Sequence, residues 1–182
     1  SQAVEAARPT LVPDGSDAIQ GQPVVRFDGV DDAMALPAGF TVLTSGVTAY
    51  AVVKPDSTAR WARFFELAGA DGAGLVSLMR KGTSTSIRYQ AGLDVADAED
   101  VLTPGAFVLV GVVQQDDGTT TLYEHGTVAG SGSAAVPEVL LRDHNQLAGT
   151  TNSAAHPFSG DLAELLVYSR ALTAQERTSL EI

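Results

Sequence analysis

The stretch Phe158-Ser-Gly-Asp-Leu-Ala-Glu-Leu-Leu-Val-Tyr-Ser-Arg-Ala-Leu-Thr-Ala-Gln-Glu-Arg177 predicts a strand followed by the start of a helix. From Leu162 to Tyr168 nearly every residue is apolar, which is typical of a strand with both faces largely covered. Glu164 is the exception, and a carboxylate in such a strand must be paired, protonated or at an edge. The stretch therefore predicts a buried strand with one carboxylate, that of Glu164, whose role the local sequence does not explain.

The second half of this stretch predicts a short terminal helix. Thr173-Ala-Gln-Glu176 has the spacing of a capping box, in which the Thr hydroxyl caps the Glu amide and the Glu side chain returns to the Thr amide. We therefore expect a terminal helix within residues 173–182. It should start at Ala174 and run to the end of the sequence, with Leu180 and Ile182 turned inward.

Outward from this stretch, short apolar or alternating segments recur at intervals of about 8–12 residues, with turn-forming residues between them. Residues 47–54 alternate, with Val47, Ala49, Ala51 and Val53 on one face, and Asp117-Gly118 is a hairpin signature between 106–114 and 119–125. Further strands are expected at 23–27, 33–36, 61–68, 74–80, 84–90 and 146–149. The pattern predicts an all-β fold: two antiparallel sheets packed as a sandwich, with one short C-terminal helix.

Three other segments are expected to lack strands. Residues 94–100 carry four acidic side chains in seven positions and predict a solvated loop, and Gly130-Ser-Gly-Ser predicts a flexible turn. Residues 1–22 predict an extended entry segment with at most one edge strand. No linker or internal repeat divides residues 1–182, so we expect a single domain.

Charge and composition exclude several classes of function. The net charge is −11, from 22 acidic and 11 basic residues. Nucleic acids and anionic membrane surfaces are bound by clusters of Lys and Arg, which the sequence lacks. There is no Cys, which removes disulfides and thiolate chemistry. No apolar run approaches the roughly 20 residues needed to cross a bilayer, so we expect no membrane insertion.

Three patches in order, Phe27-Asp-Gly-Val-Asp-Asp32, residues 107–126 and residues 158–176, resemble the laminin-G-like, concanavalin A-like lectin-glucanase jelly-roll domains of bacterial or phage type. The resemblance implies a jelly roll in which the first and third patches lie close together, with ligand sites on loops at one rim. It also implies recognition of glycans or protein partners without chemistry, and a structural or ligand-bridging Ca²⁺.

The first patch suggests a metal site. Asp28, Asp31 and Asp32 surround a tight turn, and hard cations such as Ca²⁺ prefer several carboxylate and carbonyl oxygens. If the first and third patches meet, Asp161 is the natural further ligand. The alternative is that the aspartates and Gly29 only form the turn. The acidic residues Asp94, Asp97, Glu99 and Asp100 are a second, weaker cation candidate.

Four residues are candidates for ligand binding. Trp61, between two arginines, suits stacking on a sugar ring if it is exposed, and the alternative is burial in the core. His144, Asn145 and Asn152 lie in a polar stretch, 143–156, with many hydrogen-bonding groups that suit hydroxyl recognition. The alternative is an ordinary connecting loop.

The sequence predicts no enzyme. Glycosidases need two carboxylates on one cleft face, whereas Glu164 is alone in its strand and Asp97 and Glu99 lie in an expected loop. Neither a Gly-x-Ser-x-Gly nucleophile elbow nor a phosphate-binding loop occurs.

We therefore expect a non-catalytic recognition or adhesion module, extracellular or surface-exposed, that binds carbohydrate through rim loops. The alternative is a structural or decoration domain of a larger assembly, such as a virion surface or a multidomain adhesin, acting through protein–protein contacts. A glycan site needs an accessible aromatic ring with polar groups around it, whereas an assembly face needs a broad apolar patch.

Overall fold

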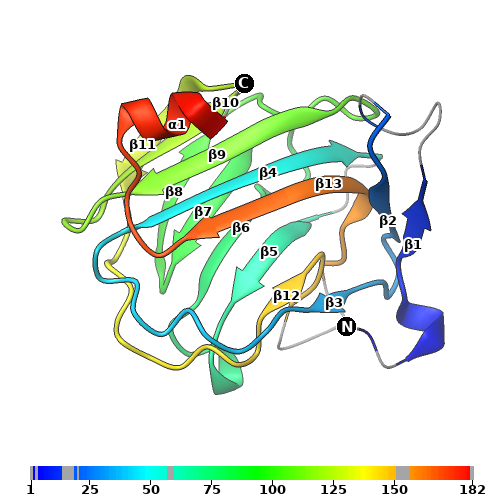
Figure 1. The fold of residues 1–182 in the computed structure, drawn as a ribbon, viewed down its shortest axis with the longest axis horizontal. Helices are drawn as coiled ribbons and strands as arrows, with labels where there is room; N and C mark the ends of the chain where they lie inside the picture. The colour runs from blue at the N-terminus through cyan, green and yellow to red at the C-terminus, as the bar shows by residue number, and fades with distance from the viewer. Residues whose placement is uncertain are drawn as a thin grey trace.

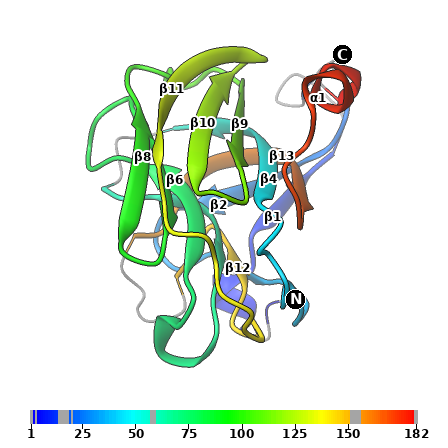
Figure 2. The same cartoon turned by 90° about the vertical axis from the view of Figure 1, so that its left-hand side faces the viewer.

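The computed structural model describes residues 2, 4–13, 19, 21–56, 60–150 and 156–180. Its strands form two antiparallel sheets that lie face to face (Figures 1 and 2). The larger sheet has seven strands in the order β1-β2-β13-β4-β9-β10-β11. Their bounds are β1 Thr10–Val12, β2 Val24–Asp28, β13 Ser159–Tyr168, β4 Val47–Pro55, β9 Val108–Gln114, β10 Thr119–Glu124 and β11 Thr127–Ser133.

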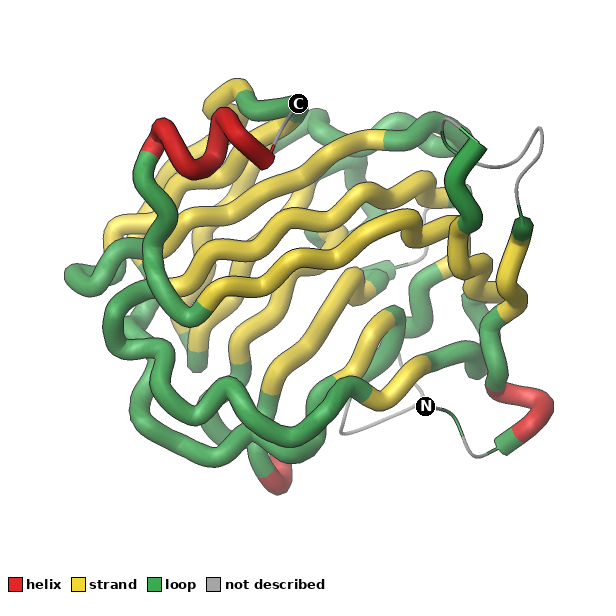
Figure 3. The backbone as a smooth tube through the Cα atoms, in the orientation of Figure 1, coloured by secondary structure: helices red, strands yellow, loops and turns green. Residues whose placement is uncertain are grey.

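The smaller sheet has six strands in the order β3-β12-β5-β6-β7-β8. Their bounds are β3 Met34–Ala35, β12 Gln146–Leu147, β5 Arg63–Leu67, β6 Val76–Arg80, β7 Ile87–Ala91 and β8 Asp94–Ala98. Two short 3-10 helices, η1 (Glu5–Ala7) and η2 (Ala70–Gly72), and one α-helix, α1 (Ala174–Leu180), complete the described chain. This architecture confirms the predicted all-β sandwich with a short C-terminal helix (Figure 3).

The alternating strands place their small apolar residues between the sheets. On β4, Val47, Ala49, Ala51 and Val53 are all buried in the common core, as their spacing predicts. The core is completed by an aromatic group in which Phe158, directly before β13, packs edge-on against Phe27 and Phe64. Since Phe27 and Phe64 come from different sheets, this group joins the two layers.

The capping box forms as predicted. The Thr173 hydroxyl accepts from the Glu176 amide at 3.3 Å, and the Glu176 carboxylate accepts from the Thr173 amide at 2.9 Å. Figure 2 places α1 on the side of β9 and β4 that faces away from β8. The prediction that Leu180 turns inward is wrong, because α1 buries no residue and Leu180 remains 38% exposed. Ile182 lies outside the described residues. No helix in the described part of the chain has the length and apolarity to span a membrane.

The predicted acidic loop at 94–100 is instead mostly the edge strand β8. Asp94, Val95, Ala96, Asp97 and Ala98 pair in register with β7, and the two alanines face the core. The acidic charge did not prevent a strand, because Asp97 lies opposite Arg88 and accepts two hydrogen bonds from its guanidinium, at 2.7 and 2.8 Å. The compensating charge thus comes from the neighbouring strand.

The predicted flexible turn at Gly130-Ser-Gly-Ser is also wrong, since these residues belong to strand β11. A Cβ added at Gly130 would lie 2.8 Å from the Cα of Ala98, and one at Gly132 would lie 3.1 Å from the Cβ of Ala96. The glycines therefore allow β11 to approach β8 of the opposite sheet, which closes this edge of the sandwich.

Two differences from the predicted strands concern Trp61 and Glu164. The strand expected at 61–68 begins at Arg63, so Trp61 lies in a turn, with a φ of 57°. On β13 the pairing with β4 shifts at a bulge between Leu162 and Glu164. Beyond this bulge, Leu165 and Val167 pack on the core and Glu164 is exposed on the opposite face. The Glu164 carboxylate thus lies on the outer face of the seven-stranded sheet. At this position the described chain does not cover that face.

Candidate functional site

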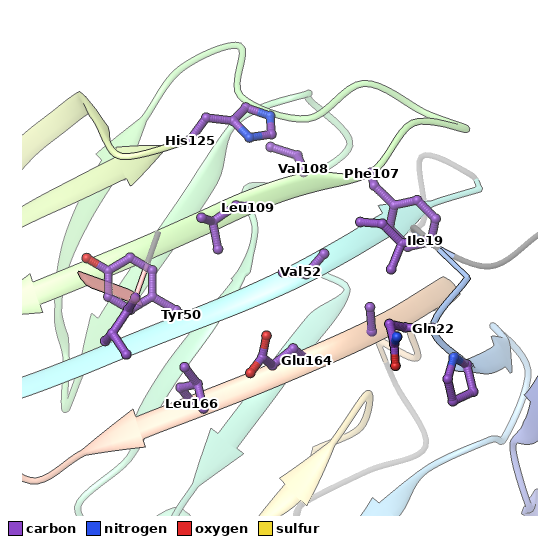
Figure 4. A pocket seen from close by; sticks show the side chains of 13 residues that line it. Ile19, Gln22, Tyr50, Val52, Phe107, Val108, Leu109, His125, Glu164 and Leu166 are labelled. Atoms are coloured by element: carbon purple, nitrogen blue, oxygen red, sulfur yellow. The ribbon is translucent and has the colours of Figure 1, made fainter. Parts of the chain in front are cut away.

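A groove of about 720 Å³ lies on the outer face of the seven-stranded sheet. Its floor is formed by outward-facing side chains of three adjacent strands, β13, β4 and β9 (Figure 4). Leu180 of α1 contributes to one wall, and Ile19, Gln22 and Pro23, which precede β2, contribute to another. We call this feature the sheet groove; it is lined by Ile19, Gln22, Pro23, Tyr50, Val52, Phe107, Val108, Leu109, His125, Ala163, Glu164, Leu166 and Leu180.

A glycine shapes the floor of the sheet groove. Gly111 on β9 is paired with Tyr50 on β4, and a Cβ added there would come within 2.7 Å of Tyr50 Cδ1. Because Gly111 has no side chain, the Tyr50 ring lies across the adjacent strand, and the residue is only 3% exposed. Tyr50 therefore forms a buried part of the floor, while Phe107 and Leu109 remain partly accessible beside it.

Three polar side chains reach the groove from separate parts of the chain. Glu164 comes from β13, His125 from the turn between β10 and β11, and Gln22 from the segment before β2. All three residues are exposed, and within the described residues their side chains make no hydrogen bond or ion pair. Figure 4 shows Glu164 between Leu166 and Gln22, with its side chain directed toward β4. The groove thus combines an apolar floor with polar groups that the fold itself does not use.

An ion triad around a buried carboxylate lies near one end of the groove, beside Phe107. Asp161 on β13 is completely buried and accepts two hydrogen bonds from Arg26, at 2.7 and 3.0 Å, while Lys54 Nζ lies 2.6 Å away. Lys54 also lies 5.2 Å from the centroid of the Phe107 ring. Burial by itself would raise the pKa of Asp161, but the hydrogen bonds from Arg26 and Lys54 outweigh it and hold the pKa below the ordinary value of an aspartate. Arg26 and Lys54 thus both compensate the charge of the buried Asp161 carboxylate.

Asp28, Asp31 and Asp32 form the acidic cluster that the sequence suggests. One carboxylate oxygen from each lies within 4.8 Å of the others. Asp28 Oδ1 accepts from the Val30 amide at 2.8 Å, and Asp32 Oδ2 accepts from the Asp28 amide at 2.9 Å, so the aspartates also shape the turn. Burial, reinforced by repulsion from Asp28 and Asp31 and opposed by the Asp28 amide, raises the pKa of Asp32.

Asp161 is not a member of this cluster among the described residues. The two patches do meet, because β13 pairs with β2 and places Ser159 opposite Asp28. Asp161 lies two residues further along, opposite Arg26, where its carboxylate joins the ion triad. We therefore restrict the candidate cation site to the three aspartates around the turn.

The three candidate residues of the polar stretch 143–156, His144, Asn145 and Asn152, do not form one site in the described structure. Asn145 is 1% exposed, and its amide accepts from the Ala68 amide and donates to the carbonyls of Pro37 and Arg142. These contacts give Asn145 a structural role, and we do not include it in the proposed binding site. His144 is exposed beside Asp143, with 2.7 Å between Nδ1 and Oδ1. Asn152 lies outside the described residues.

Trp61 lies over the outer face of the six-stranded sheet, opposite to the sheet groove. Its ring is partly exposed and stacks against Arg88, whose Cζ is 5.1 Å from the ring centroid. Arg88 is held by Asp97, which also lies 3.0 Å from Lys81 Nζ, and Lys81 in turn bonds Glu99 at 2.6 Å. Three of the four acidic residues suggested as a second cation site thus have partners in the fold. Asp97 bonds Arg88 and Lys81, Glu99 bonds Lys81 and Ser86, and Asp100 bonds Thr85.

Sequence reasoning did not find the sheet groove. Its lining residues come from segments as distant as 19–23, 50–52, 107–109, 125 and 163–180, so no local motif joins them. One signal was available: Glu164 is a single carboxylate in an apolar strand. The prediction that such a group must be paired, protonated or at an edge omitted a fourth case, namely a central strand whose outer face is open.

Comparisons with known proteins agree with this architecture. Domain 4 of AbnA, an extracellular arabinanase from Geobacillus stearothermophilus, solved with arabinotriose, is similar with a TM-score of 0.73 and 21% identity, over 96% of this chain and 81% of that chain. The CBM40 of a Ruminococcus gnavus sialidase, bound to α2,3-sialyllactose, is similar with a TM-score of 0.63 and 13% identity, over 82% and 96% of the two chains.

A heptameric SAP-like pentraxin from Limulus polyphemus gives a TM-score of 0.63 and 16% identity, over 99% of this chain and 84% of that chain. At these identities the similarities show the fold alone. The search of curated proteins found no match. The family model described as concanavalin A-like lectin/glucanases superfamily matches residues 28–176, which is most of the sequence. With this match and its two-sheet antiparallel sandwich, the chain belongs to the concanavalin A-like lectin/glucanases superfamily.

Proposed function

We propose that the protein is a non-catalytic carbohydrate-binding module that holds an oligosaccharide in the sheet groove. The observation that carries this proposal is the set of three exposed polar side chains, Glu164, His125 and Gln22, around an apolar floor, without partners in the described fold. This replaces the rim loops expected from the sequence with the outer face of the sheet as the binding surface.

The lining of the groove suits the chemistry of a sugar. Sugar rings have apolar C–H faces, which can lie against Phe107, Leu109 and Val52, and hydroxyl edges, which can bond a carboxylate, an imidazole and an amide. A volume of about 720 Å³ also falls in the usual range of small-ligand pockets. The proposal thus uses both the floor and the polar rim of the groove.

The groove supports binding rather than hydrolysis. Glycoside hydrolysis uses two carboxyl groups roughly 5–10 Å apart on either side of the scissile bond. Among the described residues that line the groove, Glu164 is the one carboxylate, and the buried Asp161 nearby bonds Arg26 and Lys54. We therefore expect no turnover of a bound glycan.

The comparisons support this proposal without assigning a ligand. Two of the similar structures are domains solved with a bound sugar, one with arabinotriose and the other with sialyllactose. The first of them belongs to an extracellular arabinanase. By analogy we propose a glycan partner and an extracellular or surface-exposed location for this chain. The binding module would serve to hold a larger protein on a glycan surface.

One feature favours a second candidate, a contact surface for another protein in a larger assembly. Most of the accessible lining is aliphatic, including Val52, Leu109, Leu166 and Leu180, and an assembly interface uses such a patch. The two candidates differ in the role of the polar rim: a sugar requires Glu164, His125 and Gln22, whereas an apolar protein contact tolerates their replacement.

Binding to a panel of oligosaccharides and polysaccharides that includes arabinotriose tests the proposal. Leu109→Trp, which fills the groove, should weaken binding by roughly tenfold or more, which corresponds to about 1.4 kcal/mol. Trp61→Ala on the opposite sheet is the matched control and should bind as the wild type does. Wild-type binding that is lost in Trp61→Ala and retained in Leu109→Trp would move the site to the other face. A panel without any binding would favour the assembly surface.

We also propose that Asp28, Asp31 and Asp32 hold a structural Ca²⁺. A cation there would relieve the repulsion that contributes to the raised pKa of Asp32. Thermal unfolding with Ca²⁺ and with a chelator tests this, because a ligand that prefers the native state raises the midpoint. Asp31→Asn should abolish the shift, whereas Asp56→Asn, a change of an exposed aspartate outside the cluster, should retain it. Identical wild-type midpoints in both solutions would overturn the cation site.

A further inference from the structure

We propose that the sheet groove selects uncharged oligosaccharides and rejects sugars that carry a carboxylate, with Glu164 as the residue that discriminates. This inference rests on the proposed carbohydrate-binding function and names its substrate class. It is carried by the position of Glu164 in the groove and by the state of the cations near it.

The bulge in β13 places Glu164 at the centre of the groove. Leu162 pairs with Val53, and after the bulge Glu164 pairs with Val52 and Leu166 with Tyr50. Because of the extra residue, both Ala163 and Glu164 line the groove. The carboxylate therefore lies beside two floor residues, Val52 and Tyr50, on the adjacent strand, where any ligand that fills the groove must contact it (Figure 4).

The chemistry of a free carboxylate favours one class of sugar. An ionised carboxylate offers only acceptors, so it can bond two hydroxyl groups of an uncharged sugar at once. A uronic or sialic acid would bring a second negative charge to the same apolar surface, where repulsion is screened less than in bulk water. The net charge of −11 adds a weaker repulsion of the same sign.

The cations near the groove do not offset this charge. None of the described residues that line the groove is Lys or Arg. Arg26 and Lys54 lie at its Phe107 end, but both bond Asp161, which is fully buried. Turning either cation toward a ligand would leave a buried carboxylate with less compensation, which is costly. Among the described lining residues, an acidic sugar therefore meets one unbalanced carboxylate and no available cation.

Pairs of ligands, one uncharged and one that carries carboxylate, test the inference. We would measure the affinity for galactotriose against trigalacturonate, and for lactose against 3′-sialyllactose, by titration calorimetry. In the wild type the uncharged member of a pair should bind roughly tenfold tighter, as expected for one like-charge contact in a half-open site. High salt should reduce this ratio, because it screens the Glu164 charge.

Two variants separate the role of Glu164 from that of the net charge. Glu164→Gln keeps the size and removes the charge, so the ratio should fall to about twofold by the same Coulomb argument. Glu99→Gln removes one charge from the opposite sheet and should leave the ratio unchanged. If Glu164→Gln does not fold, Glu164→Thr, which suits a strand, gives the same test.

The possible results distinguish this inference from the function on which it rests. Acidic ligands that bind as well as their uncharged partners, or a ratio that Glu164→Gln does not change, overturn the charge selection and leave carbohydrate binding intact. Absence of binding by every member of both pairs and of the wider panel overturns both proposals. Preference for uncharged sugars that Glu164→Gln removes and Glu99→Gln retains supports both.

Discussion

The outer faces of the two sheets differ in whether their charged side chains are paired. On the six-stranded sheet, Arg63 pairs with Glu66, Arg88 with Asp97, and Lys81 with both Asp97 and Glu99. On the seven-stranded sheet, the described residues that line the sheet groove are mostly aliphatic and include one carboxylate, that of Glu164. On the first face these charged groups are paired with one another, whereas the groove on the second face holds polar side chains without partners in the described fold.

This difference shows which face is suited to recognition. A cross-strand ion pair already has its partner, so a ligand must break it before it can bond either group. In the groove, a ligand can bond Glu164, His125 and Gln22 without breaking any contact in the described fold. An exposed apolar surface with convergent polar groups is, in addition, the usual composition of a binding site. Substitutions on the two faces can test this reading.

The largest effect is expected at the buried carboxylate beside the groove. Asp161→Asn should lower the free energy of unfolding by about 3 kcal/mol at neutral pH, because it leaves Arg26 and Lys54 beside a neutral amide. Since the ion triad lowers the pKa of Asp161 in the folded protein, its stabilisation is complete above the unfolded-state pKa and is lost as the pH falls through the folded-state pKa.

Urea unfolding of the wild type and Asp161→Asn at several pH values checks this prediction. The difference between the two proteins should be constant above pH about 5 and should shrink in more acidic solution. A difference that stays constant down to the acid limit would show that the asparagine acts through packing rather than through charge.

The next effect is expected at the glycine in the floor of the groove. Gly111→Ala should cost about 2 kcal/mol, because the added Cβ would overlap the Tyr50 ring and force it upward into the groove. Ligand binding should weaken in the same variant. Gly92→Ala is a control for the loss of glycine in a turn, where a Cβ would meet no atom within 4 Å, although the positive φ of 60° adds its own strain. Unfolding midpoints and ligand titrations of the two variants give the comparison.

A smaller effect is expected from an ion pair on the six-stranded sheet. Asp97→Asn should lower the free energy of unfolding by about 1 kcal/mol, less than Asp161→Asn, because the Asp97 side chain is 23% exposed and water compensates part of the loss. The hydrogen bonds from Arg88, which lower the pKa of Asp97, give this contribution the same pH dependence. Equal losses for the two variants at neutral pH would contradict the view that burial sets the difference.

The smallest effect is expected at Trp61. Trp61→Ala should cost about 0.5–1 kcal/mol through loss of the stacking on Arg88, with glycan affinity unchanged. Titration of the wild type and this variant with the same oligosaccharide checks it. A clear loss of affinity would instead place a sugar-stacking role on the six-stranded sheet, as the sequence allowed, and would reverse the functional comparison of the two faces.

The sequence by itself determined the class of fold. Alternation at 47–54, the Asp-Gly hairpin at 117–118 and the capping box from Thr173 to Glu176 each depend on neighbours within a few residues, so local reasoning was sufficient. It failed at β8, where four acidic residues suggested a loop, because the arginine that balances Asp97 lies on the adjacent strand. The acidic cluster at 28–32 was also visible, since its members share one turn.

Only the tertiary structure decided the location of the sheet groove. Glu164, His125 and Gln22 are far apart in the chain, and they converge because β13, although near the C-terminus, lies between β2 and β4 in the sheet. The sequence showed that Glu164 was unusual, but its environment depends on whether another layer covers its strand. Hydrophobic alternation records which side chains face the core, whereas an open outer face is decided by what the rest of the chain leaves uncovered.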